Sequence, residues 1–492
     1  MRYFMGIDLG TSSVKALIVD ERGGIVSGAQ QGYDIRKERI EYAEQNADML
    51  WEATKKVIAG AVADAPIGAE EIAGIGYSGQ MHGLVMVDRD GKPIRDAIIW
   101  ADQRSASTIE EIHGIIPREE YQAVSLNALS TGFLVASLMW VKRHEPQSFE
   151  RIAKVMLPKD YIRFKMCGLY GTDASDASSA AIFDTARRDW AWDFIDRLGL
   201  SREFFPPCHE AYEIAGEVSA ACAAETGLRA GTPVVYGGGD TPMQGVGNGL
   251  IGPGTLTANI GTACQLAAIL DAPKHDALYR TNTFCHICDS TWMLMGAHLS
   301  GGVALKWLRD QVLMMGSYDE MTAVAATAPA GSEGLLFLPY LSGERTPCND
   351  PNARGVWLGL SLKHSRAHMI RSVMEGIVLG LRNSLAIFEG LGVEFDRIVA
   401  SGGGARGRLF REIQADVFGR EIYMNAGNEQ ACTGAALTAA VGVGTYKSFA
   451  EACAQMVRYS PEVVAPNMEN HKLYEERFQI YKEIYGHNRD LF

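Results

Sequence analysis

Short apolar runs and longer helical stretches alternate along the whole chain. Runs of strand length, among them Val14–Val19 and Leu84–Val87, lie between glycine-rich turns, and stretches such as Met369–Phe388 are rich in good helix formers. Glycine at the end of a strand permits a tight turn and lets the backbone come close to a ligand. The alternation predicts an α/β fold.

Two segments in different halves of the chain repeat one layout. Ile7–Thr11 is followed by the apolar run VKALIVD, and Asn259–Thr262 is followed by the apolar run CQLAAIL. Each predicts a strand, a Gly-Thr turn and a returning strand. Duplication of one phosphate-gripping hairpin explains this likeness better than chance does.

The length of the chain predicts two large domains, because 492 residues are too many for one ordinary core. The glycine-rich stretch Gly237–Gly254 separates the two hairpins and is the expected hinge. We therefore expect a first domain over residues 1–245, a second over 246–455 and a helical tail over 456–492. The tail carries a stripe of aromatic residues at helical spacing, which predicts packing on a domain: Tyr474, Phe478, Tyr481 and Tyr485.

Composition narrows the classes of partner. Lysine and arginine total 46 against 59 acidic residues, and the net charge of −13 argues against nucleic acid or an anionic membrane as the main partner. No apolar run is long enough to span a membrane, and the first residues lack a signal-peptide layout. Nine scattered cysteines are typical of reduced thiols, so we expect a cytoplasmic protein.

Glycine motifs favour phosphate binding without a classical P-loop. The chain has no GxxxxGK[ST] motif. Gly74–Gly79 fits GxGxxG but continues into a strand and a turn, where a dinucleotide fingerprint requires a helix. Gly402–Gly407 follows a strand at Arg397–Ala400 and opens a helix at Leu409–Phe418, so its N–H groups suit a phosphate. A tight turn without a ligand remains the alternative.

Two aspartates are candidates for phosphoryl-transfer chemistry. Asp8 precedes the hydroxyl-rich turn Thr11–Ser13, where a carboxylate can hold Mg²⁺ directly or through water. Asp240 follows three glycines and the strand Pro233–Tyr236, a position from which it can accept a hydroxyl proton. On the local pattern alone, a turn-capping aspartate explains Asp240 more often.

Two further clusters have the composition of a sugar site. Gln80-Met81-His82 and Trp100-Ala101-Asp102-Gln103-Arg104 combine hydrogen-bonding groups with an aromatic or methionine wall at strand ends. Each of these residues alone is more often structural, so only the clustering indicates a site.

Taken together, these segments resemble the FGGY carbohydrate kinases of the actin-like ATPase superfamily. The resemblance runs nearly end to end, through MGIDLGTSSVKA, GYSGQMHG, AIIWADQR, LPKDYIR, YGTDASDAS, GGGD, PYLSGERTP, RGVWLGLSLKHSRAHMIRSVMEG and SGGGARG. QMHG, LPKDYIR and PYLSGERTP are similar to the xylulokinase branch in particular. The resemblance to the family implies two actin-like (ribonuclease H-like) domains with the active site in the cleft between them. It also implies ATP-dependent phosphorylation of a small sugar, D-xylulose first, with gluconate, ribulose or a polyol as alternatives.

The resemblance also implies roles for individual residues. Asp240 would be the catalytic base, and Asp8 would lie by Mg²⁺ and the phosphates, both reaching the metal through water. Sugar contacts would come from Gln80, Met81, His82, Trp100 and Asp102. The nucleotide would be bound by Thr11, Ser12, Ser13, Lys15, Gly261, Thr262, Gly403, Gly404, Ala405, Asn425 and Gly434. The partners expected are the sugar and ATP, with a homodimer possible.

Three positions depart from the xylulokinase pattern. Ala101 replaces an asparagine, Thr241-Pro242 replaces Asn-Ala after the base, and Ser137 replaces a lysine. The first two flank the expected sugar pocket, and gluconate kinases also carry WAD, so a sugar acid is the second substrate candidate. A non-catalytic actin-like regulatory protein is the alternative of a different class, and the retained Asp8 and Asp240 argue against it.

Overall fold

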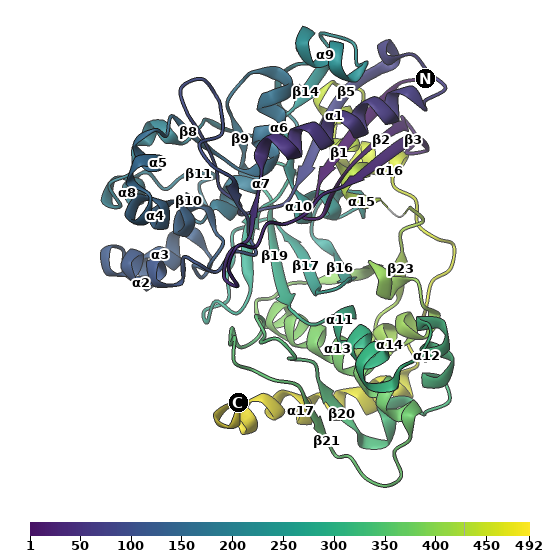
Figure 1. Cartoon of the computed structure of the whole chain (residues 1–492). Helices are drawn as coiled ribbons and strands as arrows, with labels where there is room; N and C mark the ends of the chain where they lie inside the picture. The colour runs from purple at the N-terminus through teal and green to yellow at the C-terminus, as the bar shows by residue number, and fades with distance from the viewer. Residues whose placement is uncertain (428) are drawn as a thin grey trace.

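The computed structural model describes residues 1–427 and 429–492, which form two lobes around two separate sheets (Figure 1). The first sheet has the order β13-β14-β5-β1-β2-β3: Ile214–Glu217, Pro233–Val235, Ile72–Gly79, Tyr3–Leu9, Ser13–Asp20 and Ile25–Gly32, with β15 (Gly238–Gly239) also on β5. The second has the order β18-β19-β17-β16-β22-β23: Asn282–Cys285, Trp292–His298, Cys264–Leu270, Gly254–Ile260, Phe395–Ser401 and Ile422–Met424.

The two sheets share one topology. β1 pairs antiparallel with β2, β2 pairs antiparallel with β3, and β5 and β14 continue the sheet in parallel. In the second sheet β16, β17 and β19 form the same antiparallel ribbon, and β22 and β23 continue in parallel. The duplicated hairpin predicted from the sequence is thereby confirmed, as is the α/β class.

Helices cover the sheets and extend the first lobe. α1 (Ala47–Ala63) lies against β2 and β3, and a helical extension lies beside the first lobe. The extension contains α2 (Ala106–Ile115), α3 (Arg118–Ser125), α4 (Leu134–His144), α5 (Pro146–Glu150) and α8 (Trp192–Arg197). α6 (Pro158–Cys167), α7 (Ala174–Ala177) and α9 (Ala220–Thr226) complete the lobe. Within the described residues, no helix is long and apolar enough to cross a membrane.

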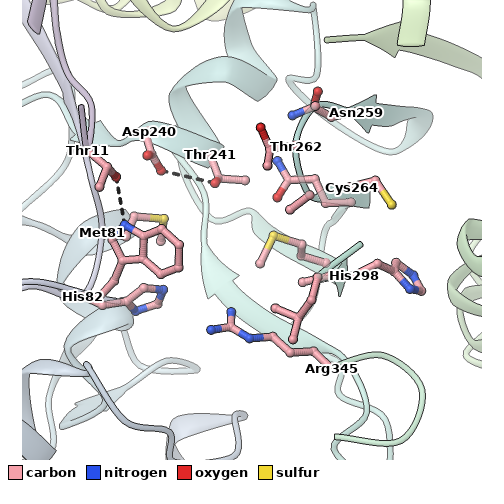
Figure 2. Close-up of a pocket in the computed structure, with 17 residues that line it drawn as sticks. Thr11, Met81, His82, Asp240, Thr241, Asn259, Thr262, Cys264, His298 and Arg345 are labelled. Atoms are coloured by element: carbon pink, nitrogen blue, oxygen red, sulfur yellow. Dashed lines mark hydrogen bonds between the residues drawn. The ribbon is translucent and has the colours of Figure 1, made fainter. Parts of the chain in front are cut away.

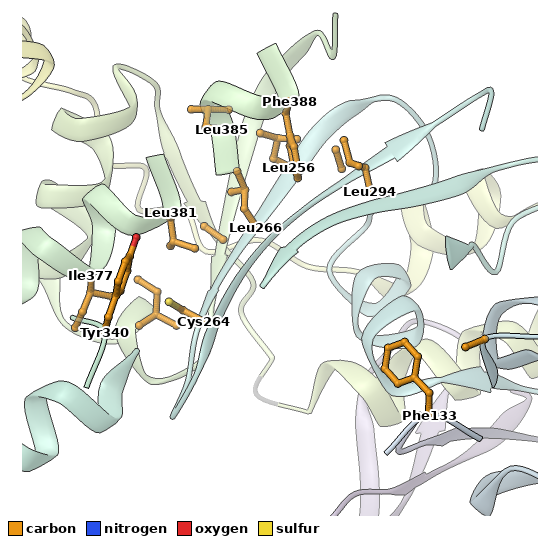
Figure 3. Close-up of a cluster of buried hydrophobic side chains, with 14 of the residues drawn as sticks. Phe133, Leu256, Cys264, Leu266, Leu294, Tyr340, Ile377, Leu381, Leu385 and Phe388 are labelled. Atoms are coloured by element: carbon orange, nitrogen blue, oxygen red, sulfur yellow. The ribbon is translucent and has the colours of Figure 1, made fainter. Parts of the chain in front are cut away.

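In the second lobe, the long helix α13 (Arg366–Gly390) packs on the sheet. Figure 3 shows Leu381, Leu385 and Phe388 of this helix facing Leu256 and Leu266 of the strands. The remaining helices are α11 (Gly302–Trp307), α12 (Tyr318–Ala325), α14 (Arg408–Phe418) and α17 (Met468–Asn488). The helices predicted over 369–388 and 409–418 are confirmed.

The predicted packing of the tail is also confirmed. α17 lies on α13 and α14, with Tyr474, Phe478 and Tyr481 buried. Tyr485 is partly buried, and its hydroxyl donates to Asp350 (2.7 Å).

Helix α15 (Gln430–Gly442) lies with its backbone directly against the first sheet. Gly6 and Gly76 are register partners on β1 and β5. A Cβ at Gly6 would overlap the carbonyl oxygen of Cys432, and one at Gly76 would overlap that of Ala435. The GxGxxG pattern of Gly74–Gly79 therefore lies in β5 and serves helix packing, which confirms that it is not a dinucleotide turn.

The domain limits expected from the sequence differ from the packing. α15 and α16 (Phe449–Met456) belong in space to the first lobe, where they share an apolar cluster with Phe4, Leu17 and Val19. Figure 1 shows them beside the strands of that lobe. The chain thus leaves the first lobe, returns to it and leaves again before the tail helix. Segment 246–455 is not one spatial unit.

The expected hinge is also narrower than predicted. Residues 240–247 form the helix α10 (Asp240–Gly247), which packs along α15, and only residues 248–253 form irregular turns. The Tyr459 hydroxyl donates to the Asn248 carbonyl (2.8 Å) at the start of this link. Gly245 and Gly247 are buried in this helix, so the interpretation of these two glycines as part of a flexible hinge was wrong.

In addition to the chain link at residues 248–253, hydrogen bonds at strand β18 join the two lobes. The Asn127 side chain donates to the Thr283 carbonyl (2.8 Å) and accepts the Thr283 N–H (2.9 Å). The Cys285 N–H donates to the Ser178 hydroxyl (3.0 Å). These bonds attach an edge strand of the second sheet to the first lobe.

We predict that Gly76→Ala destabilises the protein by about 1–3 kcal/mol or more, because a methyl group forces α15 away from the sheet. Urea unfolding measures the change in free energy. Gly114→Ala is the matched control: a Cβ there meets nothing within 4 Å, and alanine favours its helix. Equal stability of the two variants would show that α15 does not need the glycine face.

Candidate active site

A cavity of about 340 Å³ opens between the two lobes, as the expected interdomain cleft requires. The first lobe contributes five of the residues that were predicted from the sequence to form the site: Thr11, Met81, His82, Trp100 and Asp240. Strands and turns of the second lobe contribute Asn259, Gly261, Thr262, His298 and Arg345 among others. Figure 2 shows Thr11, Met81, His82 and Asp240 on one side of this space and Asn259, Thr262, His298 and Arg345 on the other.

Asp240 is the first residue of α10 and lines the cavity. The short strand β15 pairs with the end of β5 and delivers the aspartate to the cleft. The Thr241 hydroxyl donates to Asp240 Oδ1 (3.2 Å). Burial, and then the nearby charge of Asp8, raise the pKa of Asp240 to about 7. This carboxylate is thus poised to gain or lose a proton near neutral pH.

Asp8 lies one residue before the end of β1, with its carboxylate next to the same site. The Ser78 hydroxyl on β5 donates to Asp8 Oδ1 (2.7 Å). Burial raises the pKa of Asp8, while Ser78 and Lys15 oppose the shift. The pKa values thus show two buried carboxylates close enough for one charge to affect the other.

This pair of carboxylates fits a magnesium ion carried by a nucleotide. Mg²⁺ is usually held by one or two carboxylates together with phosphate oxygens and water. No group of three or more His, Cys, Asp or Glu residues in the described part of the chain is arranged to hold a metal by itself. A cation at Asp8 and Asp240 would offset the cost of burying their charges and the repulsion that Asp8 exerts on Asp240.

His82, one of the expected sugar contacts, is fixed in the wall of the cavity in its neutral form. Its backbone has φ 73°, and its ring stacks on Phe133 with centroids 4.2 Å apart. Its N–H donates to the Ser179 hydroxyl (3.0 Å), and Nδ1 lies 2.8 Å from the Ser179 carbonyl oxygen. Burial lowers the pKa of His82 to about 4. Because Nδ1 must donate to the carbonyl, Nε2 is left as an acceptor.

Trp100 and Thr11 form one wall of the cavity. The indole N–H of Trp100 donates to the Thr11 hydroxyl (2.9 Å). Gln80 lies behind this wall: it donates to Gln45 (2.7 Å), which in turn donates to the Thr11 carbonyl (2.7 Å). Gln80 does not line the cavity, and the structure gives it a supporting place in contrast to the sugar contact expected.

Asp102 likewise does not line the cavity. It is fully buried, accepts two hydrogen bonds from the Arg104 guanidinium (2.9 and 2.7 Å) and accepts the Ala43 N–H (2.7 Å). Its carboxylate oxygens are therefore committed to an internal ion pair. The expected sugar contact is replaced by a structural role that orients the turn after Trp100.

The residues of the second lobe that were expected to bind phosphate divide into two groups. Gly261 and Thr262 line the cavity, and the Gly302 N–H donates to the Gly261 carbonyl (2.7 Å). The turn Gly403–Ala405 is brought beside them because β22 runs parallel to β16, and Gly404 packs on Ile260.

In the turn expected to bind phosphate, only Thr11 lines the cavity. Ser12 follows it on the turn, Ser13 begins β2, and the Ser13 hydroxyl accepts from Gln30 (3.0 Å). The Lys15 ammonium lies 2.7 Å from a Glu429 carboxylate oxygen, so it meets an acidic partner in this structure.

Asn425 and Gly434 have packing roles here. The Asn425 side chain donates to the Gly247 carbonyl (2.7 Å) at the end of α10. Gly434 is buried on α15, and a Cβ there would overlap the Met243 carbonyl oxygen. α10 covers Gly434 in this structure.

A fully buried cluster of charged side chains is linked by hydrogen bonds to residues of the site. The Lys159 ammonium lies 2.6 Å from Asp160, 2.9 Å from Asp173 and 3.7 Å from Asp176, all four side chains being at 0% exposure. Burial raises the pKa of Asp176, as do the neighbouring carboxylates, while Lys159 opposes the shift.

Two serines connect this cluster to the cavity residues. Ser179, which fixes the histidine described above, donates its hydroxyl to Asp176 (3.3 Å). The Ser175 hydroxyl donates to Asp173 and accepts the Gly239 N–H (3.1 Å), immediately before the candidate base. One buried cluster therefore holds both ends of the site.

Sequence reasoning missed two residues that the second lobe contributes to the cavity wall. Arg345 and His298 line the cavity, although the PYLSGERTP segment that contains Arg345 was used only for the resemblance. Of the departures, Thr241 lines the cavity and Ala101 does not. Ser137 is buried in α4 of the helical extension.

Comparison with known proteins gives this geometry its context. Residues 3–247 match the N-terminal domain model of the FGGY family of carbohydrate kinases, and residues 256–443 match its C-terminal domain model. The chain belongs to that family. A xylulose kinase of Bacillus subtilis is 33% identical, the alignment covering 100% of this chain and 98% of that protein. The sugar-kinase class inferred from the sequence is confirmed.

Solved structures of the family have the same two-lobed fold. A gluconate kinase from Lactobacillus acidophilus superposes with a TM-score of 0.94 at 25% identity, covering 99% of this chain and 98% of that one. A ligand-bound xylulose kinase from the same species gives the same TM-score and identity, covering 99% of each chain. The expected two-domain FGGY architecture is confirmed.

Because the folded-state pKa of Asp240 is raised, its ionisation costs stability. The stability that the protonated Asp240 carboxyl provides, relative to the ionised form, is fully present below its unfolded-state pKa of about 4. It is lost as pH rises through the folded-state pKa of about 7. We predict that Asp240→Asn makes the ligand-free protein more stable at pH 8, by at most about 4 kcal/mol, and less so at pH 5. Thermal unfolding at both pH values measures this, with the exposed Asp90→Asn as control. A less stable variant at pH 8 would identify a turn cap instead.

Proposed function

We propose that this protein transfers the γ-phosphoryl group of ATP to the terminal C5 hydroxyl of D-xylulose. The observation that carries the proposal is the place of Asp240, a carboxylate with a pKa near 7 that lines a cavity between sugar-side and phosphate-side residues. The names of the relatives support D-xylulose as the acceptor. The products are D-xylulose 5-phosphate and ADP.

In the proposed reaction Asp240 is the base. Its ionised carboxylate orients the C5 hydroxyl and takes the proton as the oxygen bonds to the γ-phosphorus. The bond from that phosphorus to the bridging oxygen breaks, and ADP leaves with the electron pair. A pKa near the working pH suits this role, because the group must be ionised before reaction and protonated after it.

Asp8 and Asp240 are the proposed holders of Mg²⁺, directly or through water. When bound together with ATP, the ion would neutralise part of the negative charge of the phosphates. Met81, His82 and Trp100 would bind the sugar. Both Gly-Thr turns and the N–H groups of Gly403, Gly404 and Ala405 would bind the nucleotide, as a helix start does for phosphate.

The remaining parts of the proposal concern the setting of the enzyme. We propose a cytoplasmic location and a homodimer, the second of which light scattering tests. A sugar acid such as gluconate is the second substrate candidate, because the Arg345 guanidinium lines the cavity. A non-catalytic role is disfavoured by two carboxylates whose charges interact at the cleft.

We predict that D-xylulose has the highest kcat/KM in a panel that also contains L-ribulose, gluconate, glycerol and xylitol. A coupled assay of ADP release measures each value, and a nuclear magnetic resonance spectrum of the product locates the phosphate. A clear preference for gluconate or glycerol would overturn the assigned substrate and leave the kinase class intact.

We predict that Asp240→Asn lowers kcat by about 10²–10⁴-fold while the Kd for ATP stays nearly unchanged, because asparagine keeps the size but cannot accept the proton. Turnover and ATP binding are measured on one folded preparation. A variant that keeps more than roughly a tenth of wild-type kcat would show that another group is the base.

A further inference from the structure

The guanidinium of Arg345 is a cation without a partner in the cavity. It lies between β20 (Leu336–Leu338) and β21 (Val356–Leu358), and among the described residues its side chain makes no hydrogen bond or ion pair. The preceding Glu344 is turned away, since it accepts the Leu299 N–H (2.8 Å) and lies 3.7 Å from His298. Burial lowers the pKa of Arg345. An enclosed cation of this kind is costly unless it meets an acceptor.

His82 provides the complementary group. In Figure 2 Arg345 reaches toward His82, while Asp240 lies at the opposite end of the group of side chains. The charge of Arg345 contributes to the lowered pKa of His82, so the two are near each other. His82 Nε2 accepts only, whereas Arg345 donates only. The rings of Phe133 and Phe284 make the surroundings of the histidine apolar.

This pair distinguishes oxygens by their hydrogen-bonding capacity. A carbonyl or carboxylate oxygen accepts from Arg345, and a neighbouring hydroxyl donates to His82. With a polyol, both oxygens carry protons, and His82 satisfies only one of them. The second hydroxyl proton then lacks an acceptor in an apolar corner, which weakens binding.

We propose that Arg345 is a specificity-determining residue that, together with His82, selects substrates carrying an acceptor-only oxygen beside a hydroxyl, at the end remote from Asp240. This chemistry is shared by 2-ketoses and aldonates and is absent from polyols. The inference rests on the proposed function, because it assumes that the sugar occupies this cavity with its reacting hydroxyl at Asp240.

The experiment compares D-xylulose, gluconate and xylitol as substrates of the wild type and Arg345→Met. Because Arg345→Met loses a charged hydrogen bond, we expect kcat/KM to fall by about 10–10²-fold for the compound that the enzyme uses, D-xylulose or gluconate. For xylitol we expect a fall of less than about 3-fold. Arg345→Lys keeps a donor and should give an intermediate ketose-to-polyol ratio. Arg354→Met is the matched control, because Arg354 is exposed on the same connection.

Equal losses for the ketose and the polyol, or no loss for either, would overturn the selection. Separate responses of D-xylulose and gluconate show which acceptor oxygen the pocket uses. Calorimetric titration of the three compounds into both proteins gives the same ratio without turnover. A wild type that binds these compounds but phosphorylates none would refute the proposed function, and the ratio of affinities would still decide the role of Arg345.

Discussion

The close approach of α15 to the first sheet is the constraint on which the site depends. Because Gly6 and Gly76 have no side chains, the helix backbone lies directly on β1 and β5. The same helix receives α10 along its side, where Gly434 makes room for the Met243 carbonyl. β1 carries Asp8 near its end, and α10 begins with Asp240. The position of one helix thus fixes the spacing of the two carboxylates.

The site combines chemistry with a cost in stability. Burial raises the pKa of both partly buried carboxylates, and the charge of Asp8 raises that of Asp240 further, an arrangement that favours unfolding at neutral pH when no cation is present. The buried cluster around Lys159 fixes Ser175 and Ser179, whose hydrogen bonds hold Gly239 and His82 in place. A nucleotide with its metal would complete the charge balance.

Local sequence patterns gave the paired hairpins, the strand ends and the turn that carries Asp240, since these depend on residues close in the chain. The resemblance added the proposed base and the proposed sugar-binding residues. Neither could reveal why Gly74–Gly79 is glycine-rich, because the cause is a helix more than 350 residues away in sequence. Asp102 and Gln80 illustrate the same limit: polar residues beside a pocket face inward to an ion pair or a second glutamine. Only the assembled lobes decide which side of a turn faces the ligand.

The return of the chain to the first lobe has a consequence for biosynthesis. A ribosome releases the strands of the first sheet early, but the helix that covers the glycine face of β1 and β5 emerges only after nearly the whole second lobe. At about 5–20 residues per second, this face stays open to solvent and chaperones for tens of seconds, roughly 20–70 s. The first lobe cannot finish folding as a separate nascent unit. Excision of residues 1–245 would likewise yield a fragment with one uncovered sheet face, rather than an independent sugar-binding module.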